Sequence, residues 1–223
     1  MKKYLLSITL LTLCVIIIAS CVKDRSITVT TVAPPPVNTS KDTLIYYWNF
    51  NTDSISALLP TFGVTADAAL SYLGASFDTV QPGTTLNAIG ADSVLSGYSA
   101  ALRLRNPASG PFVIVIPTTG YKNIAIKYAE DHTSKGATVN TVTYTTNGGY
   151  TWKNTAIATY NPTYSIDSLD TNNGFQLISF DFSTDDSVNN NPNFMVQINF
   201  GTGATNTSGN DRFDNLTVYG QRQ

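Results

Sequence analysis

The sequence predicts an all-β protein whose strands pack as two antiparallel sheets. Only 13% of the 223 residues are charged, while Thr, Ser, Asn, Gly and Tyr are frequent, and β-branched and aromatic residues suit pleated, half-buried surfaces. Short apolar runs alternate with turn residues along the chain. Helical periodicity rich in Lys, Glu and Ala is almost absent after the first 21 residues, and Glu130 is the only glutamate. About eight or nine strands without intervening helices are therefore expected to form a β-sandwich.

The individual strands are expected at short runs between Gly, Pro, Asn and Asp residues. The run 44–50 is apolar on both parities, as in a strand buried on two faces. Ile124, Ile126 and Tyr128 alternate with other residues and are expected to point inward. Residues 59–99 show the weakest pattern and predict irregular loops with one or two short strands. The other expected strands are 101–104, 112–116, 139–146, 150–152, 175–182, 194–200 and 213–219.

The chain begins with a predicted export signal. Two lysines precede an apolar run over residues 4–19, which is shorter than the roughly 20 residues of a membrane-spanning helix. The run ends in Ile-Ala-Ser before Cys21, which resembles the bacterial lipobox, whose cysteine is lipidated and becomes the first mature residue. We therefore expect a signal peptide over 1–20 and a lipid anchor on Cys21. The alternative is an uncleaved amino-terminal anchor.

A tether is expected between the lipid anchor and the folded domain. Residues 21–41 include Pro34-Pro35-Pro36, which favours an extended, semi-stiff segment. Lys23-Asp24 resembles the surface-export signal of Bacteroidota lipoproteins, although Arg25 replaces the second acid. The expected location is the cell envelope, as an outer-membrane lipoprotein that is exposed at the cell surface. No disulfide is expected, because the two cysteines lie in the signal segment and at the lipidation position.

The region 42–223 resembles the jelly-roll modules of secreted and surface proteins in Bacteroidota, which are similar to carbohydrate-binding modules and galactose-binding-like domains. The resemblance is carried by residues 47–51 on the first strand, 101–104 in the middle and 211–218 on the last strand. It implies a jelly-roll β-sandwich and an architecture that is used for binding rather than one defined activity.

The resemblance also implies a structural calcium ion, because many such jelly rolls hold calcium where the first and last strands meet. Asp214 stands at the matching position, and Asn51 or Asp53 would add oxygen ligands. The alternative is that Asp214 and Asn215 only satisfy backbone groups at a strand start. No other cofactor is expected.

Residues 145–152 resemble the Asp-box hairpin of sialidases, with Thr and Asn in place of the usual Ser and Asp. In that motif the polar residue holds the turn and the tryptophan, here Trp152, packs beneath it. Propellers show the motif repeatedly, whereas it occurs once here, so a sialidase is not expected.

The cluster with acid–base potential is Glu130-Asp131-His132, which includes the only histidine of the chain. It is followed by polar residues, and we expect a solvated loop after a strand. If the segment is extended instead, neighbouring side chains point to opposite faces and the two carboxylates do not form a pair.

Asp followed by Ser or Thr and an aliphatic residue occurs six times. This pattern resembles the acceptor motif for O-glycosylation in Bacteroidota, and it also suits strands that start after turns. The acceptor hydroxyls would be those of Thr43, Ser54, Thr79, Ser93, Ser168 and Ser187.

Aromatic rings are the natural sugar-binding groups, because flat rings stack on the apolar faces of sugars. Trp48 and Trp152 are expected in the core. The tyrosines expected at exposed positions, where they could bind a ligand, are Tyr47, Tyr121, Tyr150 and Tyr160.

The expected function is non-catalytic binding of a glycan or another extracellular ligand by an envelope lipoprotein. The first alternative is a structural or adhesin-type subunit that makes protein contacts through strand edges. The second is a glycan hydrolase that uses Asp residues. The net charge is −2 and no basic patch stands out, so nucleic acid is not expected as a partner. The membrane is expected as a partner, through the lipid anchor.

Overall fold

The computed structural model describes residues 42–52, 56–63, 67–94, 99–153, 158–160, 174–201 and 209–223. The chain divides into the units Met1–Pro34 and Pro35–Gln223, and every described residue belongs to the second unit. The predicted signal peptide, Cys21 and the tether therefore lie outside the described residues. No helix in the described ranges is long and apolar enough to cross a membrane.

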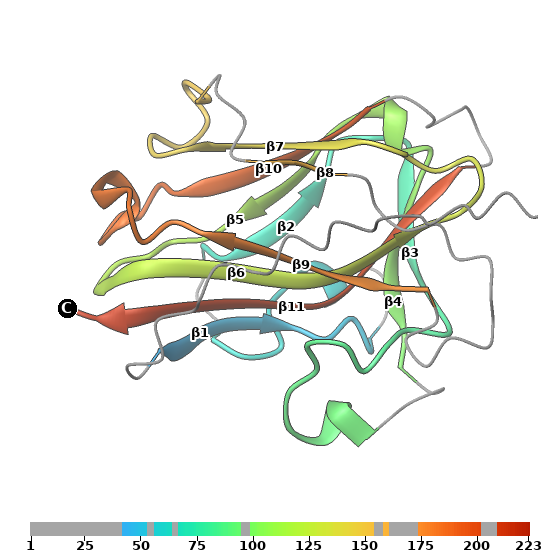
Figure 1. Ribbon diagram of the computed structural model, residues 1–223, viewed down its shortest axis with the longest axis horizontal. Helices are drawn as coiled ribbons and strands as arrows, with labels where there is room; N and C mark the ends of the chain where they lie inside the picture. The colour runs from blue at the N-terminus through green and yellow to red at the C-terminus, as the bar shows by residue number, and fades with distance from the viewer. Residues whose placement is uncertain are drawn as a thin grey trace, which may run out of the picture. The chain divides into compact units, whose positions relative to one another are not determined.

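The described strands form two antiparallel sheets, as the sequence predicts, and together they make a jelly-roll β-sandwich (Figure 1). Helical structure in the described part is limited to four short 3-10 turns. Sheet A has the order β3-β4-β11-β6-β9, with β1 also paired to β11: β1 (Thr43–Trp48), β3 (Ser76–Val80), β4 (Ala101–Arg105), β6 (Tyr121–His132), β9 (Gln176–Asp181) and β11 (Asn210–Arg222). Sheet B has the order β2-β5-β10-β7-β8: β2 (Ala69–Tyr72), β5 (Phe112–Val115), β7 (Asn140–Thr145), β8 (Ala158–Tyr160) and β10 (Met195–Phe200).

The long strand β11 organises sheet A. It pairs with β6 on one side, and on the other side with β4 at its start and β1 at its end. The register shifts between Asp214 and Thr217, where Asn215 adopts a positive φ of 49°. Asn tolerates this left-handed conformation better than most residues. The resulting bulge lies beside β1, where the first and last strands meet.

The core lies between the two sheets and is rich in aromatic rings. Ile124, Ile126 and Tyr128 are fully buried, which confirms the predicted inward face of β6. Trp48 is also fully buried, as expected. Leu44 has the same parity as Trp48 in the sequence, but a register shift between Leu44 and Tyr46 places it opposite Tyr219 and leaves it half-buried.

The remaining strand predictions agree with the described strands, except for one hairpin. The described part of residues 59–99 holds two short strands, β2 and β3, among irregular segments. The partner of β7, however, is Ala158–Tyr160 rather than the predicted 150–152. Before that pairing begins, the N–H of Lys153 donates to the carbonyl of Tyr144 across the turn.

Candidate functional site

Tyr47 lies on the outer side of sheet A but is only 4% exposed, so the prediction that it is exposed for ligand stacking is wrong. Its hydroxyl oxygen lies 2.8 Å from Asn215 Oδ1 and 3.2 Å from Asp92 Oδ2, and its single proton donates to one of these oxygens at a time. The main-chain N–H of Ile89 donates to the same hydroxyl at 3.4 Å. The segment before and within η2 (Gly90–Val94) thus packs onto β1, which agrees with the two-faced apolar pattern of that strand.

Burial and the neighbouring carboxylate both act on the Tyr47 hydroxyl. Burial is the main reason that the pKa of Tyr47 is raised above its usual value, and the negative charge of Asp92 raises it further. Tyr47 is therefore a neutral hydrogen-bond donor. It links residues 84–92, which we call the covering segment, to the bulge of β11.

Asp214 is fully buried at the same bulge. Its Oδ2 accepts the main-chain N–H of Thr84 at 2.7 Å, and its Oδ1 accepts that of Asn215 at 2.8 Å. Burial raises the pKa of Asp214 well above its usual range, and these two hydrogen bonds lower it by a smaller amount. The side chain of Asn215 donates to the carbonyls of Thr84 and Leu86, so both residues hold the covering segment.

The oxygens around Asp214 fit a hard cation in part. Ser99 Oγ is buried without a hydrogen-bond partner, and a Cβ on Gly83 would collide with both Asp214 Oδ2 and Ser99 Oγ. Asn51 Oδ1 accepts the N–H of Ala100 at 2.7 Å. Because Ala100 follows Ser99, this bond brings the Asn51 oxygen to the same junction as Asp214 Oδ2 and Ser99 Oγ. Calcium takes about six to eight oxygens, so main-chain carbonyls or Asp53, which lies outside the described residues, would have to complete the shell. Among the described residues, no group of three or more His, Cys, Asp or Glu side chains could hold a metal ion.

A groove of about 370 Å³ lies at the other end of β1, beside the start of β6. Its size falls in the range of small-ligand sites. Tyr46 is buried and its hydroxyl donates to the Pro117 carbonyl at 2.8 Å, which fixes one wall. Gly63 has a positive φ of 76°, and a Cβ there would clash with the Ile45 carbonyl, so only glycine fits. The described lining residues are Ile45, Tyr46, Gly63, Asp67, Pro117, Thr119 and Tyr121.

Tyr121 is the predicted ligand-binding tyrosine that the structure places in this groove. Its ring is half-buried, and the Arg222 guanidinium lies over it, 5.9 Å from the centroid. This cation–π contact and the packing of Tyr121 against the core hold the ring at the wall of the groove. Asp67 and Thr119 are exposed in the groove and offer a carboxylate and a hydroxyl for hydrogen bonds.

The other two predicted tyrosines lie away from the groove. Tyr150 is 91% exposed at the tip of the hairpin after β7, as expected. Tyr160 pairs with Asn140 in the β7–β8 ladder, and the position of its side chain is outside the description. The hairpin turn is held by Asn147, whose Oδ1 accepts the N–H of Thr151 at 3.0 Å, which is the structural role expected from the Asp-box resemblance. Trp152 is half-buried rather than in the core.

The prediction of a solvated loop at Glu130-Asp131-His132 is wrong. These residues end β6 and all three are buried, because pairing with β11 continues through them. Asp131 faces outward and forms a two-pronged ion pair with Arg212. Glu130 faces inward and accepts from Asn140 Nδ2 at 2.5 Å. The two carboxylates therefore point to opposite faces and do not form an acid–base pair.

The candidate O-glycosylation sites differ in accessibility. Ser93 and Ser187 are exposed, although the Ser93 hydroxyl donates to the Gly90 carbonyl and the Ser187 hydroxyl donates to Asp185. Thr43 and Thr79 are half-buried in β1 and β3. Ser54 and Ser168 lie outside the described residues.

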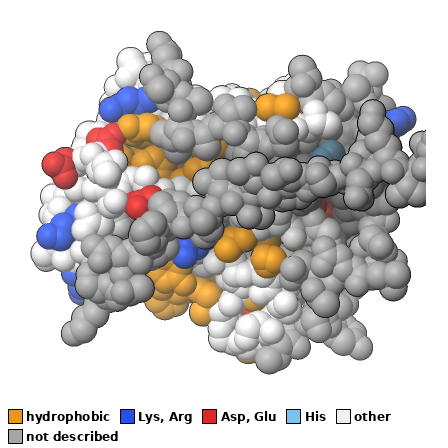
Figure 2. Space-filling view, in the orientation of Figure 1, with side chains coloured by type: hydrophobic (Ala, Val, Ile, Leu, Met, Phe, Trp, Pro, Cys, Tyr) orange, Lys and Arg blue, Asp and Glu red, His pale blue; other side chains and the backbone are white. Residues whose placement is uncertain are grey.

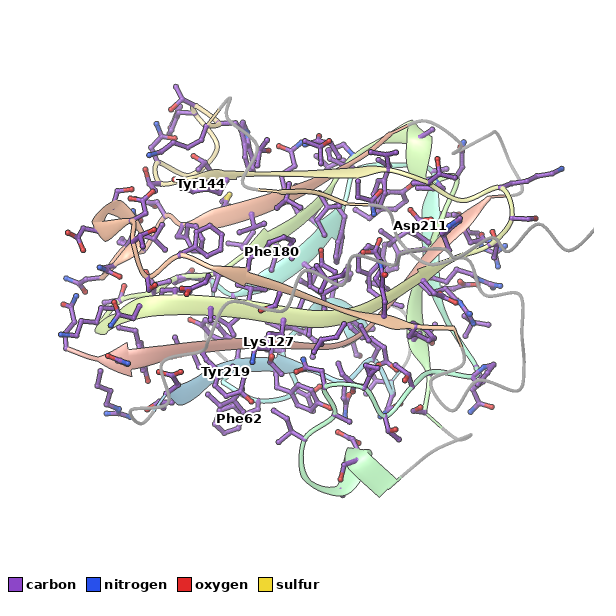
Figure 3. All side chains as sticks on the ribbon, viewed as in Figure 1. Phe62, Lys127, Tyr144, Phe180, Asp211 and Tyr219 are labelled. Atoms are coloured by element: carbon purple, nitrogen blue, oxygen red, sulfur yellow. The ribbon has the colours of Figure 1, made fainter. Side chains whose placement is uncertain are left out.

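Figures 2 and 3 show the domain in the orientation of Figure 1. Hydrophobic side chains gather there in separate small groups, with cationic and acidic side chains between them (Figure 2). Phe180 lies between the sheets, and Asp211 and Tyr144 lie toward opposite ends of the sandwich (Figure 3). Phe62 is 51% exposed.

Three solved structures are similar to this chain in fold. The CBM22-1 xylan-binding domain of Paenibacillus barcinonensis Xyn10C has 10% identity and a TM-score of 0.47, over 82% of this chain and 97% of that one. The CBM22-1-GH10 modules of Clostridium thermocellum xylanase 10B have 12% identity and a TM-score of 0.46, over 81% of this chain and 29% of that one. The K1 cleaved adhesin domain of Lys-gingipain from Porphyromonas gingivalis W83 has 8% identity and a TM-score of 0.45, over 80% and 99%. No protein-family model and no curated protein matches the chain.

Proposed function

We propose that this protein is a non-catalytic glycan-binding lipoprotein of the cell envelope, and that the groove beside Tyr121 is its glycan site. The observation that carries the proposal is the groove itself. It combines a half-buried tyrosine ring held by Arg222 with the exposed polar groups of Asp67 and Thr119. An apolar ring face and a few convergent polar groups are what a sugar ring requires, because sugars present apolar C–H faces and polar hydroxyl edges.

The outer face of sheet B is a less suitable glycan site than the groove. Gln197 donates to Asn199, which donates to Thr143, so a polar ladder crosses β10 and β7. The described side chains of β5, β7 and β10 place no aromatic ring on this face. A sugar would therefore find hydrogen bonds there but no described stacking surface.

Hydrolysis is not favoured at the groove. Glycoside hydrolysis normally uses two carboxylates on either side of the scissile bond. Among the described residues that line the groove, Asp67 is the only carboxylate. The groove therefore offers a surface for binding and lacks the acid–base pair for turnover.

The proposal includes the lipid anchor on Cys21 and display at the outer membrane. It is supported by the lipobox and by the proline-rich segment that follows it. A lipid-anchored module on a tether would hold a polysaccharide near the cell without releasing it.

The test is a screen of soluble polysaccharides against the full chain, purified in detergent, with bound ligand and released reducing ends both measured. Retention of one class of polysaccharide without release of reducing ends is the expected result. Released ends that accumulate with time would show a hydrolase instead. Absence of binding by a folded chain would favour the protein-interaction alternative.

A further inference from the structure

Four strands of sheet A carry a row of charged side chains on its outer face, far from the groove. In register across β3, β4, β11 and β6 stand Asp78, Arg103, Arg212 and Asp131. We call this set the arginine row. Its two arginines lie directly opposite each other, an arrangement that is normally destabilising in a sheet. Each is stabilised by an acid on its far side, so the row has the charge order negative, positive, positive, negative.

A second row runs beside the arginine row, two residues along each strand. Arg105 of β4 lies between Ser76 of β3 and Asn210 of β11. Because side chains two residues apart point to the same face, Arg105 projects on the same side as Arg103. A hydroxyl, a guanidinium and an amide therefore stand next to one another on the outer face of three strands.

The two rows hold three arginines and two acids, so they carry one more positive charge than negative charges. Asp78 Oδ2 accepts from Arg103 Nη2 and from Arg105 Nη2, each at 2.6 Å, while Arg103 Nε donates to Asp78 Oδ1. One carboxylate thus serves two guanidinium groups, and the other acid, Asp131, is engaged by Arg212. Arg105 is 45% exposed, and the described residues give its Nε and Nη1 no acceptor. Its remaining donors are available to a ligand.

We infer that Arg105, with Ser76, Asn210 and Arg103 beside it, binds the carboxylate or sulfate group of an acidic glycan. Guanidinium donors match both anions in a forked geometry, and the neighbouring hydroxyl and amide suit the sugar hydroxyls next to the charged group. The site lies at the start of β11 and the Tyr121 groove at its end, roughly 35–40 Å apart at the rise of an extended strand. It therefore stands independently of the proposed function of the groove.

The inference is tested by equilibrium binding of the full chain to dextran, carboxymethyl dextran and dextran sulfate, which share one backbone. Low ionic strength is used because salt screens exposed charges. We expect binding to a charged dextran and none to neutral dextran, and the two charged polymers distinguish a carboxylate from a sulfate ligand. Arg105→Gln should weaken binding about tenfold or more, because a charge-assisted hydrogen bond is lost.

Three further variants distinguish a specific binding site from a general charge effect, from a purely structural ion network and from the Tyr121 groove. Asp78→Asn removes the competing acid and should strengthen binding, a gain that a folding defect cannot produce. Lys122→Gln removes an exposed cation at the far end of β6 and should leave binding unchanged. Tyr121→Ala should also leave it unchanged, which keeps this result distinct from that of the groove.

Three results would overturn the inference: no retention of either charged dextran, equal losses in Arg105→Gln and Lys122→Gln, or an Asp78→Asn variant that is less stable without any change in affinity. The last result would assign the row to protection of the edge strand β3.

Discussion

Single polar residues buried at the β11 bulge determine how the covering segment attaches to sheet A. Tyr47, Asp214 and Asn215 each bond to main-chain or side-chain groups of residues 84–92. Buried polar groups are stable only when their hydrogen bonds are made, so each one specifies the position of the segment. The Asp-Asn pair in the sequence indicates this place, whereas Asp92 stands in the weakly patterned stretch and could not be identified in advance.

Tyr47→Phe tests the hydroxyl at this bulge. The substitution keeps the ring and removes the donor to Asn215, which leaves a buried acceptor without that bond. We expect the free energy of unfolding to fall by about 1–3 kcal/mol in urea denaturation. Tyr150→Phe is the matched control, because its side chain is 91% exposed and should change stability by less than about 0.5 kcal/mol. Equal effects of the two variants would contradict this account.

Asp211 gives a pH dependence of known sign. The residue is fully buried and its Oδ2 has no hydrogen-bond partner among the described residues. Burial raises the pKa of Asp211 well above its usual range, and the N–H of Ala137 lowers it by less. Above the unfolded pKa the native state therefore holds more protons than the unfolded state, so the stability contribution of Asp211 falls as pH rises through the folded pKa.

Asp211→Asn mimics the neutral carboxyl and cannot titrate. As pH rises above about 4, the ordinary aspartate pKa, the free energy of unfolding of the wild type should fall more steeply than that of Asp211→Asn. Parallel curves for the wild type and Asp211→Asn would refute the raised pKa.

At the scale of elements, periodicity predicts strands well and their ends poorly. Ile124, Ile126 and Tyr128 alternate clearly and are buried, but the polar Glu130-Asp131-His132 that ends β6 gives no strand signal. Tertiary pairing with β11 extends the strand through these residues. Arg212 and Asn140 bond to the buried carboxylates of Asp131 and Glu130 and so offset part of the cost of burying them. The predicted strand 150–152 after β7 is wrong for a related reason. Asn147-Gly148 indicates the turn, but it does not indicate the residue at which pairing with β7 resumes.

Calcium binding is a prediction about the junction between β1, β11 and the covering segment. Asp214, Asn51 and Ser99 supply oxygens there. A bound cation would offset the cost of burying the Asp214 carboxylate, so calcium should raise the melting temperature and a chelator should lower it. Asp214→Asn should abolish this response. If calcium and chelator leave the wild type unchanged, Asp214 serves only to accept main-chain N–H groups.

At the scale of the whole molecule, composition and alternation predict the two-sheet sandwich, and the described residues confirm it. The groove could not be predicted from the sequence. Its lining comes from separate segments around Ile45, Gly63, Thr119 and Tyr121, which no local spacing connects. Tyr121 was identified only because a partly exposed aromatic ring is a general feature of sugar sites.

Membrane attachment is predicted from the lipobox alone. Cys21→Ala removes the thiol that would carry the lipid, so the chain should move from the membrane fraction to the soluble fraction of its native host. Fractionation by detergent partitioning and immunoblotting measures this. An unchanged membrane fraction would indicate the uncleaved amino-terminal anchor instead.

The most direct test of the central claim compares Tyr121→Ala with Tyr150→Ala in binding to an oligosaccharide of the polysaccharide that the full chain retains. Calorimetric titration gives each affinity. We predict that Tyr121→Ala loses about tenfold or more, equivalent to at least about 1.4 kcal/mol, and that Tyr150→Ala stays within about twofold of the wild type. Unchanged affinity in a folded Tyr121→Ala variant would contradict the groove as the glycan site, and a loss confined to Tyr150→Ala would move the site to the hairpin tip.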